Sequence, residues 1–282
     1  MRVSPLALLL FATVQTQTST GAEHVPPGLG PFTFQGDLVR GPVDRGRTRR
    51  ARFEVDPVVD VSIIALGLTL SFGSQLVISS HELPPSEVRS ASTLNGLDRP
   101  FARAPSGSAA GTVSDVLVAA AFSAAAVDTF FELARDEPFG LVPVGVMYAE
   151  TVATVFAVSN LTKLAVRRPR PRAYEVAPTI IDDTLSFFSL HTAFTAALGA
   201  TAAQLAFERP AESTASWWIL GAATVVTAAV GAGRVAAGEH FPTDVVAGAI
   251  VGAAVGTLVP RFHRKIVIGA SSHGAWVSVP ID

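Results

Sequence analysis

Six long apolar stretches dominate this chain, and they restrict it to a fold in which apolar helices pack together or cross a membrane. Small and branched apolar residues fill the stretches, whereas Pro, Gly and charged residues collect in the connections. The lengths and periodicity favour helices. The expected helices are Val58–Ser80, Ala109–Arg135, Leu141–Val166, Phe187–Phe207, Thr214–Val235 and Thr243–Phe262. We therefore predict an all-α fold, a bundle of about six apolar helices.

The sequence is compatible with a bundle surrounded by lipid and with one surrounded by water. Charged residues make up 16% of the chain, against about 25% in a soluble domain. The first stretch is uncharged from 61 to 80, which is long enough to cross a bilayer, but the second contains Asp115 and Asp128 and the third contains Glu150. Small residues around Gly248 and Gly252 permit close helix approach in lipid and in a dry protein core alike.

The sequence predicts four regions along the chain. Residues 1–22 resemble a secretory signal peptide, with an apolar run from Leu6 to Val14 and a cleavage site after Ala22. Residues 23–57 form a Pro-, Gly- and Arg-rich linker, and residues 58–264 form the helical domain. Residues 265–282 form a C-terminal extension with the pattern of a short β-hairpin.

Charge and cysteine content exclude several functions. The net charge is −2, which gives no overall basic field for nucleic acid. A local run of arginines between Arg40 and Arg52 fits a solvated linker or a contact with anionic lipid headgroups. The chain has no cysteine, so it has neither disulfides nor thiolate metal sites.

Three polar motifs interrupt the apolar pattern. Lys163, one of only two lysines, lies at the end of an apolar helix, and Arg170 follows between two prolines that end the helix and hold the chain extended. Ser189 falls where a hydroxyl would cap the helix that contains His191, and free N–H groups at such an end attract phosphate. Each motif alone is also explained by a solvated helix end or a capping serine.

The third motif joins Arg234, His240 and Asp244 across the start of the last helix. Pro242 suits the first turn of that helix, so Asp244 can approach His240 and orient its imidazole. An oriented imidazole can act as a nucleophile.

Together the three motifs resemble the signature of the type 2 phosphatidic acid phosphatase and vanadium haloperoxidase superfamily. The matching pattern is Lys163-x6-Arg170-Pro171, then Ser189-x-His191, then Arg234-x5-His240-x3-Asp244. The resemblance covers roughly residues 58 to 263, and its specific content lies between Lys163 and Asp244.

The resemblance implies a role for each residue. His240 would attack phosphorus to form a phosphohistidine, Asp244 would orient it, and His191 would protonate the leaving oxygen and then activate water. The phosphate oxygens would be held, with no metal and no other cofactor, by Lys163, Arg170, Ser189 and Arg234. The implied partner is a phosphorylated lipid, such as phosphatidate or a polyprenyl diphosphate, or a small phosphomonoester at a membrane.

Three neighbours depart from the family pattern. Phe188, Leu190 and Gly233 stand where the family usually has Pro, Gly and Ser. A leucine resists backbone conformations that a glycine allows, so we expect an altered or narrower substrate range with activity retained.

Two other functions fit the same motifs. In a vanadate-dependent haloperoxidase, the four residues that would hold phosphate would hold vanadate instead, with His240 as its axial ligand; we call Lys163, Arg170, Ser189 and Arg234 the cradle. A non-catalytic phosphate-binding envelope protein would fit the departures at Leu190 and Gly233.

The sequence is compatible with two locations of the site. A cleaved signal peptide followed by three spans would place Lys163 in the cytoplasm, whereas retention of the Arg40 to Arg52 cluster inside, or export of the whole bundle, would place it outside. We expect an exported site at the cell envelope.

Overall fold

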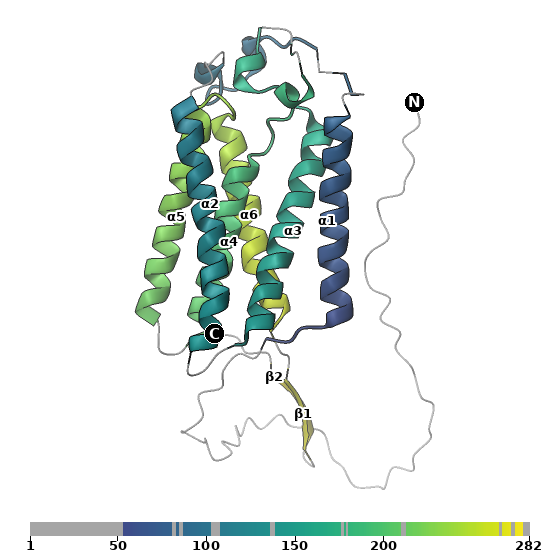
Figure 1. Cartoon of the computed structure of the whole chain (residues 1–282), viewed down its shortest axis with the longest axis vertical. Helices are drawn as coiled ribbons and strands as arrows, with labels where there is room; N and C mark the ends of the chain where they lie inside the picture. Colours follow the sequence, from purple (N-terminus) through teal and green to yellow (C-terminus); the bar gives the residue numbers. More distant parts are fainter. Residues whose placement is uncertain are drawn as a thin grey trace, which may run out of the picture. The chain divides into compact units, whose positions relative to one another are not determined.

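The protein is all-helical in the part that carries the predicted motifs. The structure is a computed structural model that describes residues 53–80, 83–84, 87–102, 108–135, 139–175, 178, 180–209, 213–264, 267–271 and 274–278 (Figure 1). Its six α-helices are α1 (Pro57–Ser79), α2 (Ser108–Phe131), α3 (Leu141–Val166), α4 (Leu190–Phe207), α5 (Ser213–Ala236) and α6 (Pro242–Phe262). The predicted helical bundle is confirmed.

The helix starts follow from capping residues. Asp56 caps α1 by accepting hydrogen bonds from the backbone N–H groups of Val58, at 2.9 Å, and Val59, at 3.1 Å. Pro242 occupies the first turn of α6, as predicted. The start of α4 was predicted too early, at Phe187. The helix begins at Leu190 because Ser189 is its N-cap, with its side chain accepting from the N–H of Thr192.

The end of α2 also differs from the prediction. The α-helix stops at Phe131, and Glu132–Ala134 form a 3-10 turn in place of a continuation to Arg135. The buried Glu132 explains the change, because its carboxylate accepts hydrogen bonds from Arg209 and from the backbone N–H of Phe139.

Helix α4 is the centre of the bundle. It contacts α2, α3, α5 and α6, whereas α1 packs on α3 (Figure 1). Many of the side chains of α4 are buried, and most of those are small, such as Ala193, Ala197 and Thr201. A central helix needs this composition because neighbours approach it from several directions.

The tightest packing is between α4 and α6. Gly248, Gly252 and Gly256 recur every fourth residue on α6, and a Cβ added at these positions would lie 2.5, 2.1 and 2.1 Å from the carbonyl oxygens of Ser189, Ala193 and Ala197 respectively. The glycines therefore let α6 lie directly against the backbone of α4, which includes the start of α4 at Ser189.

In the described part of the chain, five helices are long and apolar enough to cross a membrane. They are α1, α5 and α6, the region Ala109–Ala134 that includes most of α2, and the region Leu141–Ala173 that includes α3. Large apolar side chains stand on their outer faces, among them Leu66 at 60% exposure, Trp218 at 76% and Ile250 at 64%. An apolar surface of this extent is typical of helices that face lipid. The structure thus supports a membrane-associated protein.

The remaining predicted regions are described in part. Phe53, inside the predicted linker 23–57, is buried and packs its ring edge-on against Phe139 at 4.8 Å. The predicted signal peptide and the Arg40 to Arg52 cluster lie outside the described residues. Beyond α6, β1 (Val267–Ser271) and β2 (Gly274–Ser278) are paired antiparallel. The hairpin-like C-terminal extension stays a prediction.

We expect Gly252→Ala to destabilise the bundle strongly, because its methyl group would fall 2.1 Å from the carbonyl oxygen of Ala193. Overpacking of this kind costs about 1–3 kcal/mol. Thermal unfolding of the purified protein in detergent measures the effect. Gly221→Ala is the matched control, because it lies in the interior of α5 with nothing within 4 Å of the added methyl group. Equal melting temperatures for the two variants would contradict the close α4–α6 packing.

Candidate phosphate-binding and catalytic site

The three predicted motifs meet at one end of the bundle. That end holds the C-termini of α3 and α5 and the N-termini of α4 and α6 (Figure 1). Backbone contacts join the segments, since the N–H of Ser189 donates to the carbonyl of Asp244 at 3.1 Å. Lys163, Arg170 and Arg234 all lie close enough to His240 for their positive charges to lower its pKa.

The first motif is fixed by the end of α3. The helix stops at Val166, and Arg167 adopts a left-handed conformation with φ of 48° as its N–H donates to the carbonyl of Lys163 at 2.9 Å. The Arg170 side chain is buried, and its guanidinium donates to the backbone carbonyl and the carboxylate of Asp182, at 2.8 Å each. Arg170 is thereby held in one orientation before any ligand binds.

The imidazole of His240 has a defined tautomer. Its Nδ1 atom lies 2.7 Å from the carbonyl oxygen of Ser186, an atom that can only accept, so Nδ1 carries the hydrogen. The other nitrogen, Nε2, is left with its lone pair. Burial, and then the charges of Arg170, Lys163 and Arg234, lower the pKa of His240 well below its usual range. The imidazole is therefore neutral at physiological pH, as a nucleophile must be.

Asp244 reaches His240 indirectly. Its Oδ2 atom lies 3.9 Å from Nδ1 of His240, and that same oxygen accepts hydrogen bonds from the Ser186 hydroxyl, at 2.5 Å, and the Phe241 N–H, at 2.9 Å. We expected the carboxylate itself to orient the imidazole. In the structure Asp244 fixes Ser186, and the Ser186 carbonyl contacts the ring.

Two residues that the motif analysis did not single out complete this arrangement. Arg168 donates to Asp244 at 2.5 Å and to Asp98 at 2.7 Å, and its guanidinium stacks over the Phe241 ring at 4.3 Å. Asp98 is buried, and its pKa is lowered because hydrogen bonds from Thr243, Arg168 and Asn95 outweigh the opposing effect of burial. Arg168 stood beside Arg170 in the sequence, but no local pattern pointed to Asp98, which is 70 residues away.

Ser189 and the start of α4 form the side of the site that suits an anion. The Ser189 hydroxyl is buried and accepts from the Thr192 hydroxyl at 3.0 Å. The first N–H groups of a helix have no partner within the helix and carry partial positive charge. A phosphate oxygen near Ser189 would therefore be stabilised by the helix as well as by the side chain.

His191 lies on the accessible side of the site. Its side chain is 34% exposed, and its Nε2 atom lies 3.1 Å from a carboxylate oxygen of Asp115 on α2. The same carboxylate oxygen accepts a hydrogen bond from Arg234 at 3.1 Å. Asp115 thus links a cation of the predicted cradle to the predicted acid, a role that the sequence did not reveal because α2 carries no matched motif.

Glu239 already occupies part of the cradle. Its carboxylate contacts Arg170, lies 2.5 Å from Arg172, and lies 3.8 Å from Arg234. A bound phosphate would use the same guanidinium groups. The side chain is 20% exposed, so it can move out as an anion arrives.

The three departures from the family pattern have local structural reasons. Phe188 is buried in an apolar cluster with Val155, and the partly buried Leu190 packs against the same cluster. Gly233 faces α2, where an added Cβ would lie 3.1 Å from both the carbonyl oxygen of Ala110 and the Cβ of Ser114. A serine at 233 would therefore require α2 to shift by a few tenths of an ångström at Ala110 and Ser114.

Comparison with known proteins supports this reading of the motifs. The sequence model of the PAP2 superfamily matches residues 144–268, a segment that contains every residue of the predicted site. The match confirms the predicted resemblance for this segment.

One solved structure is similar over a larger part of the chain. It is described as the first transmembrane PAP2 type phosphatidylglycerolphosphate phosphatase from Bacillus subtilis, with 19% sequence identity and a TM-score of 0.46. The similarity covers 72% of this chain and 94% of that one. Among curated proteins, no sequence gave a significant match.

We expect Glu239→Gln to strengthen the binding of inorganic phosphate, because the anion no longer has to displace a carboxylate from Arg170 and Arg172. The affinity should rise roughly tenfold, which corresponds to about 1.4 kcal/mol. Isothermal titration of the purified protein measures it. Glu208→Gln is the matched control, since Glu208 also pairs with a guanidinium, that of Arg264, outside the site. Unchanged or weaker phosphate binding by Glu239→Gln would show that Glu239 does not compete for the cradle.

Proposed function

We propose that this protein is a phosphatase that hydrolyses a phosphate or diphosphate monoester through a phosphohistidine on His240. One observation carries the proposal. The hydrogen bond of Nδ1 to the Ser186 carbonyl leaves Nε2 of His240 with a lone pair, within electrostatic reach of three cationic side chains. A neutral nucleophile beside several cations suits attack on a phosphate, whose negative charge would otherwise repel it. The match of residues 144–268 to the PAP2 superfamily agrees with this chemistry.

In the first step, Nε2 of His240 forms a bond to phosphorus as the bond to the leaving oxygen breaks. The leaving oxygen takes a proton from His191 and departs as an alcohol or a phosphorylated alcohol. As the N–P bond forms, the ring becomes positively charged, and the Ser186 carbonyl stabilises this charge by accepting the Nδ1 hydrogen. Asp244 is a positioning residue, since it acts on the ring through Ser186.

In the second step, His191 takes a proton from a water molecule that attacks phosphorus. The N–P bond breaks, inorganic phosphate is released, and His240 regains its neutral form. Between the two steps the His191 ring is neutral and can accept this proton. Burial and the charge of Arg234 lower the pKa of His191 to about 4, and Asp115, whose carboxylate lies 3.1 Å from Nε2, opposes this by stabilising the ring whenever it is protonated.

The charge of the transition state would be stabilised by side chains of the cradle. Lys163, Arg170 and Arg234 supply positive charge, and Ser189 supplies a hydroxyl at the start of α4. Preorganised donors of this kind are the largest contribution in many enzymes. We therefore propose that the reaction itself needs no metal ion.

The bundle favours a lipid substrate. Apolar, exposed helix faces lead to the end of the bundle where the site lies, so a lipid could keep its chains in the bilayer while its headgroup enters the cradle. Phosphatidate or a polyprenyl diphosphate has the required chemistry. We propose an exported site at the cell envelope.

The test is release of inorganic phosphate from a panel of phosphatidate, polyprenyl diphosphate, an alkyl phosphate and p-nitrophenyl phosphate, in the presence of a chelator. The wild type should be active on at least one lipid of the panel, and His240→Ala should fall to background on every substrate. A wild type inactive on the whole panel would overturn the proposal. So would halide oxidation by peroxide that appears only after vanadate is added.

His191→Asn separates the acid from the nucleophile. It should lose about 10²–10⁴-fold on the alkyl phosphate, whose leaving oxygen needs a proton. It should lose far less on p-nitrophenyl phosphate, whose leaving group departs without one. Equal losses on both substrates would contradict the role of His191 as the acid.

The low pKa of His240 makes a prediction about pH. Protonation of the nucleophile should limit kcat/KM only well below pH 6.5, the usual pKa of histidine. Among the charged neighbours, Arg170 lowers the pKa of His240 the most. Arg170→Gln should therefore raise this pKa and shift the acid limb of the profile to higher pH, in addition to lowering the rate. Arg261→Gln, an exposed arginine in the last turn of α6, is the control and should leave the limb in place. An acid limb that does not move in Arg170→Gln would contradict this electrostatic account.

A further inference from the structure

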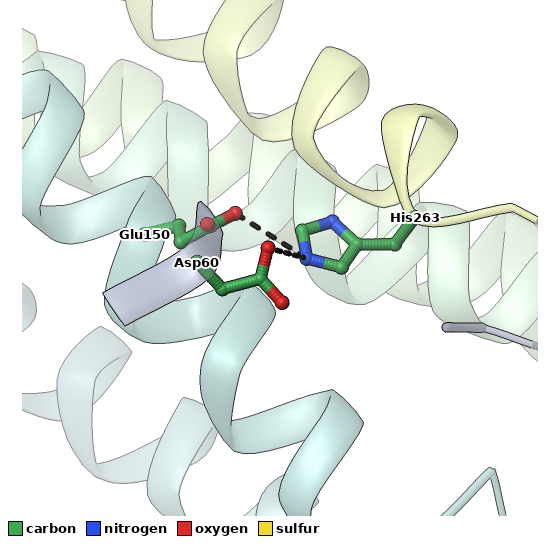
Figure 2. Close-up of side chains that lie close together, drawn as sticks. All are labelled: Asp60, Glu150 and His263. Atoms are coloured by element: carbon green, nitrogen blue, oxygen red, sulfur yellow. Dashed lines mark ion pairs between the residues drawn. The ribbon is translucent and has the colours of Figure 1, made fainter. Parts of the chain in front are cut away.

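A second group of charged side chains is buried in the part of the bundle where α1 begins and α6 ends. Asp60 comes from the first turn of α1, Glu150 from α3 and His263 from the C-cap of α6 (Figure 2). Their exposed fractions are 5%, 3% and 8%. Glu150 and Lys163 are 13 residues apart on α3, which places this group about 20 Å along the helix from the phosphate site. The group is separate from the proposed chemistry.

The three side chains point toward one another (Figure 2). Nε2 of His263 lies 3.6 Å from a carboxylate oxygen of Asp60 and 3.4 Å from one of Glu150, and one possible ligand atom from each residue lies within 4.8 Å of the others. Two ligands of a tetrahedral zinc ion, with bonds of about 2.0–2.1 Å, are about 3.3 Å apart. The two distances to Nε2 are thus slightly wider than a bound ion requires, and the carboxylates would have to close around the ion from a spacing of up to 4.8 Å.

The tautomer of His263 presents a lone pair to the two carboxylates. Its Nδ1 atom lies 2.9 Å from the carbonyl oxygen of Val259, which can only accept, so Nδ1 carries the hydrogen. A histidine that binds a metal commonly donates its other N–H to a backbone carbonyl in this way, which fixes the orientation of the ring. In the neutral ring, Nε2 is therefore an acceptor that faces two other acceptors.

Each of the three side chains also has a buried polar atom without a hydrogen bond in the described part of the chain, and for the two carboxylates this is the oxygen farther from His263. Among the described residues, Asp60 Oδ2, Glu150 Oε1 and His263 Nε2 are buried without a hydrogen bond. An added proton on Nε2 could serve one carboxylate and would leave a net negative charge in an apolar surrounding. A divalent cation would satisfy all three residues and neutralise both carboxylates at once.

A path to these residues exists. A cavity of about 1000 Å³ is lined by Asp60, Glu150 and His263 together with apolar side chains such as Ile63, Val255 and Phe262. The cavity leaves room for water molecules to complete the coordination of an ion that has only three protein ligands.

We propose that Asp60, Glu150 and His263 bind a divalent transition-metal ion that fastens α1 to α3 and α6. One imidazole and two carboxylates suit Zn²⁺ or Mn²⁺, whereas an imidazole disfavours Mg²⁺ and Ca²⁺. The segments flanking these helices are already joined, since the N–H of Glu54 donates to the His263 carbonyl at 2.8 Å. The ion would strengthen this closure, and its role is structural.

The test uses the full-length, tag-free protein in detergent, treated with chelator and then dialysed against Zn²⁺ or, separately, Mn²⁺. Elemental analysis should find one equivalent of one of these metals per chain, and the melting temperature should rise with the concentration of that metal. His263→Gln should weaken the binding at least ~10-fold and abolish the rise. His191→Gln is the matched control: it removes a histidine from the phosphate site and should keep both the metal and the rise.

Other outcomes would overturn the proposal. A wild type that binds neither metal would show that the three side chains are not a metal site. Binding that is lost in His191→Gln and retained in His263→Gln would place the ion at the phosphate site. Glu150→Gln guards against misfolding. Without metal it should melt no lower than the wild type, because one of two facing carboxylates is neutral, and with metal it should show no rise.

Discussion

The buried carboxylate of Asp244 is the constraint on which the arrangement of the site depends. It accepts hydrogen bonds from Ser186 before α4, from the backbone of Phe241 before α6, and from Arg168 after α3. A carboxylate with no exposed surface in an apolar bundle costs several kcal/mol unless donors surround it. The three segments are therefore held in the one arrangement that supplies those donors. The position of the His240 ring follows, because its contact is the carbonyl of Ser186.

Close helix packing makes this precision possible. The carbonyl of Ser189 lies against Gly248, one turn after Asp244, so the start of α4 cannot move independently of the start of α6. Gly233 acts in the same way between α5 and α2, where it brings Arg234 to Asp115. A bundle in lipid lacks a hydrophobic driving force between its helices, so contact between backbones at small residues becomes the main source of rigidity.

The sequence predicted the helices and the site residues for different reasons. Helix positions followed from apolar periodicity, and errors arose at ends decided by single side chains, such as Ser189 for α4 and Glu132 for α2. The residues from Lys163 to Asp244 were predicted from their spacing. Asp98, Asp115 and Glu239 were not, because their partners are distant in sequence or unmatched by any motif, and only the packed structure brings these carboxylates to the arginines. The contact of Asp244 with Ser186 was missed for a related reason: a spacing of four residues suggested His240, but the turn presents the imidazole to a backbone carbonyl.

The two groups of buried charged side chains, the proposed phosphate site and the group of Asp60, Glu150 and His263, differ in how their charges are balanced within the chain. At the proposed phosphate site every arginine has a carboxylate partner, and these partners differ in exposure. Asp98 and Asp244 have fully buried side chains, whereas those of Glu239, Asp182 and Asp115 are 20%, 47% and 58% exposed. An incoming anion would thus compete only with the exposed carboxylates, so the buried pairs preserve the fold while the exposed pairs exchange. At the second group, one imidazole faces two carboxylates, and Asp60 Oδ2, Glu150 Oε1 and His263 Nε2 have no hydrogen bond among the described residues. In a low-dielectric interior, the arginine–carboxylate pairs balance each other's charge without a ligand, whereas two carboxylates beside one imidazole leave negative charge that a proton or a bound cation has to neutralise.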